Sequence, residues 1–197
     1  MSSVEDTTVT NAIACLDAAY SPTSASAACA LVPEWDAATP AHVLTWRQGA
    51  AAAYEPGSFY KRELPLLLAV LGQVRDSLGA VVIDGYVWLD GARRPGLGAM
   101  LHEALPNRTP VVGVAKTRFG DASAWCIPVE RGSSRRPLFV TAVGMAAQDA
   151  VSCIRAMHGR HRIPSLLQLV DRAARAALQL DRSRWRPVLA SCKKPVQ

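Results

Sequence analysis

The sequence has few cysteines and no paired cysteine motif. Its five cysteines, Cys15, Cys29, Cys126, Cys153 and Cys192, are scattered with no Cys-x-x-Cys pair among them. An odd number at irregular spacing argues against a disulfide framework and against a structural zinc site, and it favours reduced thiols. We therefore expect a cytoplasmic protein.

Long hydrophobic runs and a secretion signal are also missing. The longest apolar segment, LPLLLAVLG at 64–72, is far shorter than the roughly 20 residues that a membrane-spanning helix needs. The N-terminal segment MSSVEDTTVT is polar and slightly acidic, and it does not have the basic and then apolar layout of a signal peptide. The sequence thus predicts no membrane partner.

The composition is that of a globular domain. The chain has 197 residues, of which 50% are hydrophobic and 19% are charged. This balance excludes a disordered chain, and the length suits one domain with a sizeable core. We expect a single domain over 1–197 with its core at about 12–180, a flexible tail at 187–197 and, as the default for such a domain, a monomer.

Charge is unevenly divided along the chain. Residues 1–100 hold six Lys/Arg against ten Asp/Glu, whereas residues 101–197 hold sixteen against six. A basic half is suited to phosphates and an acidic half to a metal ion. Arginine-rich surfaces are also common in alanine-rich proteins, so charge alone leaves nucleic-acid binding open.

Hydrophobic periodicity predicts an α/β domain with a mixed central sheet. Three short strands with tight connections indicate an antiparallel meander, at 11–20, 25–32 and 41–50. A helix follows at 64–79, with Pro65 in its first turn and Gly79 at its end. The remaining elements are strands at 80–84, 110–116, 124–129 and 137–144 and helices at 96–106, 146–159 and 163–178.

Three acids stand at notable places in that order. Asp17 lies within the first strand, Asp84 ends the strand 80–84, and Glu63 lies at the entrance to the helix between them. If the two strands are neighbours, Asp17 and Asp84 come side by side, and each raises the pKa of the other unless a cation lies between them. Mg²⁺ prefers such ligands and can activate a water for attack on a phosphate. An Asp at a strand end also often caps a turn.

An ordered set of motifs resembles the endonuclease V family. The segments are CLDAAY (15–20), AYEPGSFYKRELP (53–65), VVIDG (81–85), RRPGLG (93–98) and PVVGVAKTR (110–118), and PLFV (137–140) and the RIP…D segment (162–171) also fit. The similarity covers about 13–177. It implies an RNase H-like fold, flanking helices on a mixed sheet, and cleavage of DNA or RNA near deaminated bases, mainly inosine, with Mg²⁺ or Mn²⁺.

The resemblance also implies roles for single residues. Asp17 and Asp84 match the family's two principal metal ligands, Glu63 its third acid, and Lys116 its active-site lysine, which would stabilise charge on the phosphate. The residues that would bind nucleic acid are the wedge Tyr54, Pro56 and Gly57, the phosphate contact Arg62, the base-pocket residue Gly85, and Arg93 and Arg94.

The departures from the family pattern concern recognition. Val87 replaces the second glycine of Asp-Gly-x-Gly, so a side chain should reshape or fill the base pocket, and Glu55 brings negative charge into the wedge. No histidine lies between residues 141 and 149, where the family has one near its metal. We interpret His158 and His161 as solvated or phosphate-facing residues.

Three functions therefore remain open. The first is a divergent metal-dependent endonuclease, which the joint presence of Asp17, Glu63, Asp84 and Lys116 favours. The second is a non-catalytic or specificity-altered nucleic-acid-binding protein on the same scaffold, and the third is an interaction protein with neither property. The choice of DNA or RNA, the base recognised and the efficiency of turnover stay open.

Overall fold

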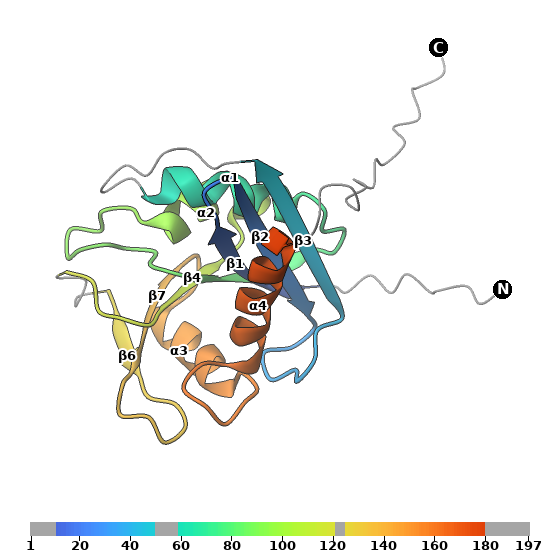
Figure 1. The fold of residues 1–197 in the computed structure, drawn as a ribbon. Helices are drawn as coiled ribbons and strands as arrows, with labels where there is room; N and C mark the ends of the chain where they lie inside the picture. The colour runs from blue at the N-terminus through green and yellow to red at the C-terminus, as the bar shows by residue number, and fades with distance from the viewer. Residues whose placement is uncertain (1–10, 50–58, 121–124, 180–197) are drawn as a thin grey trace, which may run out of the picture.

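A seven-stranded sheet forms the centre of the protein, with strand order β3-β2-β1-β4-β5-β7-β6 (Figure 1). The computed structural model describes residues 11–49, 59–120 and 125–179. The strands are β1 (Ala12–Tyr20), β2 (Ser24–Val32), β3 (His42–Gly49), β4 (Leu78–Asp84), β5 (Val111–Ala115), β6 (Ile127–Val129) and β7 (Leu138–Val143). The helices are α1 (Phe59–Leu71), α2 (Leu97–Ala104), α3 (Ala147–Ala156) and α4 (Ser165–Gln179), with a 3₁₀ turn at Pro106–Arg108.

The sheet is mixed, as the sequence predicts. Strands β1, β2 and β3 form the expected antiparallel meander. Strand β4 then pairs parallel with β1, and β5 pairs parallel with β4. The remaining strands, β7 and β6, add antiparallel at the far edge. The α/β, RNase H-like fold class is confirmed.

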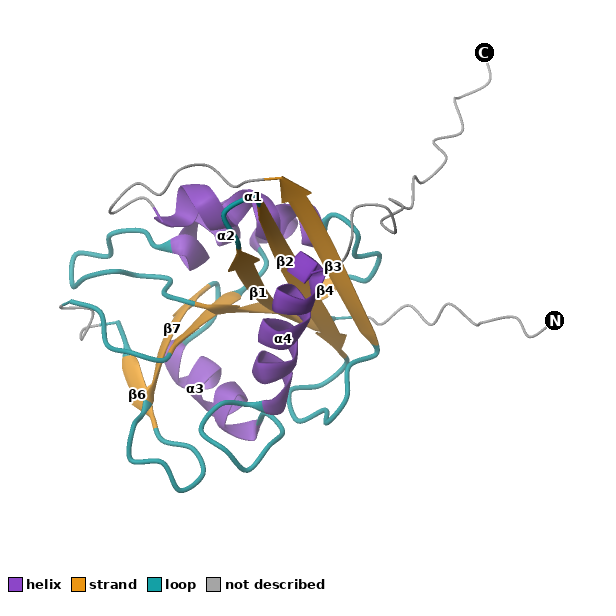
Figure 2. Cartoon of the chain, in the orientation of Figure 1, coloured by secondary structure: helices purple, strands orange, loops and turns teal. Residues whose placement is uncertain are grey.

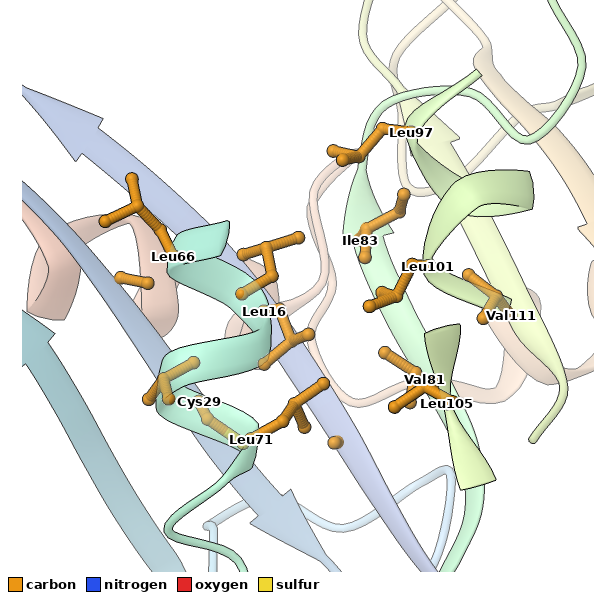
Figure 3. Packing of buried hydrophobic residues seen from close by; sticks show 14 of the residues in the cluster. Leu16, Cys29, Leu66, Leu71, Val81, Ile83, Leu97, Leu101, Leu105 and Val111 are labelled. Atoms are coloured by element: carbon orange, nitrogen blue, oxygen red, sulfur yellow. The ribbon is translucent and has the colours of Figure 1, made fainter. Parts of the chain in front are cut away.

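Helices cover both faces of the sheet (Figure 2). Alternate residues of each strand feed separate cores, because successive side chains of a strand point to opposite faces. Leu16 and Ile83 belong to the core under α1 and α2, where Leu66 and Leu101 pack toward the sheet (Figure 3). Their neighbours along the strands, Cys15 and Val82, point the other way and belong to the second core, under α3 and α4. Burial on both faces explains the near-continuous apolar strands β4 and β5.

Small side chains in β2 bring α4 close to the sheet. Every residue of the segment SASAACALV is buried. The hydroxyl of Ser26 donates a hydrogen bond of 2.6 Å to the carbonyl of Ala174 in α4. Ala28 is fully buried in the same core and is the register partner of Asp17. Helix α4 therefore lies directly over β2 and the neighbouring strand β1, which carries Asp17.

The bounds predicted for the first helix are wrong at both ends. Helix α1 begins at Phe59, so that Pro65 lies inside it and not in its first turn. The buried leucines that follow Pro65 hold the helix on the sheet, and this packing outweighs the one helical hydrogen bond that proline cannot donate. Gly79 is part of β4, where a Cβ atom would lie 2.9 Å from the carbonyl oxygen of Asn11. Close backbone approach, not helix termination, explains that glycine.

The later elements are shorter than predicted. Of the strand expected at 124–129, Ile127–Val129 is regular, Trp125 and Cys126 are not, and Ala124 lies outside the described residues. Helix α2 ends at Ala104 before the 3₁₀ turn. Within the described ranges, no helix has the length and hydropathy needed to cross a membrane. The tail 187–197 lies outside the described residues, and a single domain over 1–197 stays a prediction.

Candidate active site

Asp17 and Asp84 lie on adjacent parallel strands. Leu16 of β1 is in register with Ile83 of β4, so the two acids follow as the next pair. Neighbouring strands are separated by about 4.8 Å. Both acids face α4, and together with Lys116 and Leu138 they line a small recess of about 10 Å³. The expected side-by-side placement of these two carboxylates is therefore what the structure has.

Lys116 supplies a positive charge at this point. It directly follows β5, and its Nζ lies 2.5 Å from Oδ2 of Asp84. Burial by itself lowers the pKa of Lys116, but the hydrogen bond and the charge of Asp84 raise it more, so the net pKa lies above its ordinary value. Lys116 therefore stays protonated and offsets part of the negative charge of the acids.

Asp17 is held in an environment that disfavours its charged form. Burial first, and then the charge of Asp84, raise the pKa of Asp17 to about 7. A hydrogen bond of 2.7 Å from the N–H of Ala18 to Oδ1 partly opposes that shift. Asp17 thus gains from any cation placed beside it at neutral pH.

Glu63 joins the two strand acids from α1. The residue is 8% exposed. Burial, followed by the charges of Asp17 and Asp84, raises the pKa of Glu63 to about 8. Although α1 covers the opposite face of the sheet from α4, its second turn reaches the ends of the strands that carry both aspartates. The three acids predicted from the sequence therefore share one electrostatic environment.

Arg62 stacks on an aromatic ring beside this cluster. Its guanidinium carbon lies 3.9 Å from the centre of the Tyr20 ring. Nε of Arg62 is buried and has no hydrogen-bond partner in the described part of the chain. Burial, and then the charge of Glu63, raise the pKa of Tyr20, whose hydroxyl lies beside the Glu63 carboxylate. Buried polar groups without partners are uncommon, so Nε of Arg62 is a candidate to contact a bound ligand.

A fourth acid, Asp171, comes from α4. Its charge contributes to the raised pKa of both Asp17 and Lys116. Asp171 also forms an ion pair of 2.8 Å with Arg175, one turn further along the helix. Asp171 ends the RIP…D segment, and no role is predicted for it from the sequence. Its position at the end of that segment was the available signal.

The donor set suits a hard divalent cation. Carboxylate oxygens are the ligands that Mg²⁺ and Mn²⁺ prefer, and burial, followed by repulsion from the neighbouring carboxylates, raises the pKa values of Asp17 and Glu63. Within 11–49, 59–120 and 125–179, no three His, Cys, Asp or Glu side chains are already arranged to enclose an ion. The types of side chain present therefore fit a metal ion. Their positions in this structure do not surround one, because the carboxylate of Asp84 is bonded to Lys116.

The predicted base-pocket segment is tightly packed. Gly85 has φ of 151°, a conformation that favours glycine. Val87 is fully buried, and a Cβ atom on Gly98 would come within 2.7 Å of its Cγ2. The N–H of Val87 donates to Oγ1 of Thr141. The side chain at position 87 thus fills space against α2. The wedge residues Tyr54, Pro56 and Gly57 lie outside the described residues.

Arg93 and Arg94, which are also predicted to bind nucleic acid, already have partners within the chain. Arg93 lies over the Trp125 ring, 3.7 Å from its centre, and 5.8 Å from the centre of the Trp88 ring. Arg94 pairs with Asp90 at 3.1 Å. Both arginines are exposed. Their predicted contacts with nucleic acid stay predictions.

Comparison with known proteins gives a consistent match. The family model described as Endonuclease V matches residues 2–147. Endonuclease V from Streptomyces avermitilis is similar with a TM-score of 0.73 and 26% identity, over 86% of this chain and 82% of that chain. No curated protein matches the chain.

Two more distant structures share the fold. Human endonuclease V has a TM-score of 0.67 and 21% identity, over 86% of this chain and 84% of that chain. Ciona intestinalis endonuclease V, solved with a 24mer DNA containing an inosine followed by a ribo-adenosine, has a TM-score of 0.69 and 15% identity, over 86% of each chain.

Proposed function

This chain belongs to the endonuclease V family, and from that premise we propose that it is a metal-dependent endonuclease that hydrolyses phosphodiester bonds near deaminated bases, mainly inosine. The observation that carries the proposal is the meeting of Asp17, Glu63 and Asp84 beside Lys116 at one edge of the sheet. The proposed substrate is DNA or RNA, in keeping with the inosine-containing DNA bound by the Ciona protein.

The carboxylates would hold the metal. Asp17 and Asp84 would be its principal ligands, and Glu63 would contribute directly or through a water. When bound, Mg²⁺ or Mn²⁺ supplies charge neutralisation on the phosphate and lowers the pKa of a water. Asp171 adds a further carboxylate to the same group of charges, which increases the negative potential that favours a cation there.

Lys116 and Arg62 would act on the phosphate. The ammonium of Lys116 is kept protonated by Asp84, so it can stabilise the negative charge that develops on the reacting phosphate. Arg62 still has its Nε without a partner in the described part of the chain, and this group would donate to a backbone phosphate. Stacking on Tyr20 holds the guanidinium in position while it does so.

Recognition would depend on the segments that differ from the family. Tyr54, Pro56 and Gly57 would form the wedge that enters the nucleic acid, and Gly85 would approach the displaced base. Because Val87 is fully buried against Gly98, we expect the base pocket to be smaller than one lined by glycine, and the preference for inosine to be weakened or changed.

The decisive experiment uses matched oligonucleotides with and without inosine, single- and double-stranded, incubated with Mg²⁺, Mn²⁺ or EDTA. The wild type should cut near inosine with either metal and not in EDTA. Asp84→Asn should not cut, whereas Asp36→Asn, which changes an exposed acid in the β2–β3 connection, should cut normally. If Asp84→Asn cuts as well as the wild type, the proposed site is refuted. If the wild type cuts the oligonucleotides with and without inosine equally, the base preference is refuted but the nuclease activity is not.

A non-catalytic nucleic-acid-binding protein is the second candidate. The ion pair between Lys116 and Asp84 and the filled position at Val87 favour it. Firm binding of every oligonucleotide with no cleavage in Mg²⁺ or Mn²⁺ would select this function. For both candidate functions we expect the protein to be cytoplasmic and monomeric. Sedimentation of the purified protein would test the oligomeric state.

A further inference from the structure

Two loops at one end of the molecule carry a concentration of basic residues. The β6–β7 loop at 130–137 and the α3–α4 loop at 157–164 lie at the lower end of the view in Figure 1. Their exposed basic side chains include Arg135, Arg136, Arg160 and His161, which we call the basic surface; His158 is also exposed but forms a hydrogen bond with the hydroxyl of Ser165. The two loops contain one acid, Glu130.

The two loops are fastened to each other. Arg131 is 7% exposed, and its guanidinium donates hydrogen bonds to the carbonyls of Met157, Gly159 and His161. Gly132 has φ of 59°, and a Cβ atom there would lie 2.4 Å from the carbonyl oxygen of Arg160. The β6–β7 loop therefore follows the surface of the α3–α4 loop closely, and both loops present their basic side chains at the same end of the molecule.

Among the described residues, no acid forms an ion pair with the arginines of the basic surface. None of Arg135, Arg136 and Arg160 forms an ion pair with a described residue, in contrast to Arg94, Arg108 and Arg175. The hydroxyl of Ser134 accepts from the N–H of Arg136 and fixes the turn that presents it. Fixed and unpaired cations of one sign create a potential that attracts polyanions.

The α3–α4 loop that carries part of the basic surface also contacts the residue next to the acid cluster. Arg162, in the α3–α4 loop, donates from its NH2 group to the carbonyls of Lys116 and Pro137. Lys116 in turn contacts Asp84. A nucleic acid whose phosphate reaches Asp84 therefore has the basic surface beside it, at the end of the sheet where β5 stops and β7 begins.

We propose that the basic surface binds the sugar-phosphate backbone of the nucleic acid beyond the nucleotide at the acid cluster, without reading its bases. This proposal rests on the proposed function, because it concerns the part of the same nucleic acid that lies outside the acid cluster. Apart from histidine, the two loops contain no aromatic side chain, so base stacking is not their chemistry, whereas arginine is suited to phosphate. Contacts of this type add affinity that depends on salt and not on sequence.

The test compares Arg135→Ala/Arg136→Ala with Arg75→Ala/Arg108→Ala. The control pair also removes two exposed charges, but in the α1–β4 turn and the 3₁₀ turn, away from the two loops. Dissociation constants are measured in EDTA for one duplex, with and without inosine, at several salt concentrations. Thermal unfolding of both variants shows that they are folded.

We expect the double variant in the basic surface to bind about 10- to 100-fold more weakly at low salt, equally for both duplexes. Its plot of log K against log salt should be less steep by about 2, because two phosphate contacts are lost. The control pair should match the wild type. If the basic-surface variant has the wild-type affinity and slope, or changes no more than the control, the proposal is overturned.

Failure of the proposed function gives a different result. Cleavage by the wild type is followed in parallel in Mn²⁺. A wild type that cuts, together with unchanged binding by Arg135→Ala/Arg136→Ala, overturns the basic surface and leaves the nuclease intact. A wild type that does not cut, together with a reduced salt slope for the variant, supports the basic surface and overturns the nuclease.

Discussion

Substitution of Glu63 by glutamine should stabilise the metal-free protein at alkaline pH. Glu63 is buried beside Asp17 and Asp84, and its pKa is raised from 4.5 to about 8. The folded state therefore binds the proton of Glu63 more tightly than the unfolded state does. The stability from this proton is fully present below about pH 4.5 and is lost as pH rises toward 8.

The shift sets the size of the effect. One pKa unit corresponds to about 1.4 kcal/mol, so the penalty from Glu63 is at most about 1 kcal/mol at pH 5 and about 4 kcal/mol at pH 8. Glutamine is neutral at both values and avoids the penalty. Any cost of packing the amide is the same at both values, so the change in ΔΔG between pH 5 and pH 8, at most about 3–4 kcal/mol in favour of Glu63→Gln, isolates the charge.

Chemical denaturation in EDTA at pH 5 and pH 8 measures this change. Glu34→Gln, which alters an exposed carboxylate in the β2–β3 connection, is the matched control and should show no pH-dependent difference from the wild type. If Glu63→Gln loses stability relative to the wild type between pH 5 and pH 8, or if the difference is constant, Glu63 is not held beside the two aspartates in the way described.

Three further outcomes test other parts of the site and the fold. Mn²⁺ should raise the melting temperature of the wild type more at pH 8 than at pH 6, because protons compete for Asp17 and Glu63, whose pKa values are about 7 and about 8; a rise that is independent of pH would contradict this. Lys116→Met should lower the rate of cleavage at saturating substrate by about 100-fold or more, which single-turnover kinetics would measure; an unchanged rate would remove Lys116 from the chemistry. Arg131→Met should lower the free energy of unfolding by about 2–4 kcal/mol, since it removes the donors to three loop carbonyls; a loss below about 1 kcal/mol would contradict that role.

The arrangement of Asp17 and Asp84 could be predicted because it depends on local patterns. Each acid lies in a strand whose apolar residues and turn signals are clear in the sequence, and the meander leaves β1 free to pair with β4. The raised pKa values then follow from placing two carboxylates together and burying them. The apolar segment after Glu63 indicates only that this acid stands at the entrance to a helix; its place beside the two aspartates was implied by the resemblance to the endonuclease V family.

Residues that act through distant packing could not be predicted. Asp171 lies four residues before Arg175, which is the pattern of a solvated pair on a helix surface. Its place beside Asp17 depends on how α4 docks on the sheet. Nothing in the segment RGSSRRP separates Arg131, which is buried, from Arg135, which is exposed. The side-chain partner of Arg93 is Trp125, from a separate loop.

The exact start of α1 is a third kind of case. Pro65 is typical of a first helical turn, and only the packing of the leucines after it shows that the helix has already begun at Phe59. Tertiary contacts here outweigh a local preference.

The alanines of β2 tie the spacing of two layers to the placement of charge. Ala28 is the register partner of Asp17 and is completely buried. Even one additional methyl group at position 28 would therefore push α4 away from the sheet. Such a change would lift Asp171 away from Asp17 while leaving every carboxylate present in the sequence. The small volume of Ala28 thus sets the distance between Asp171 and Asp17. A substitution at position 28 that removes no charged group would therefore still change the pKa of Asp17.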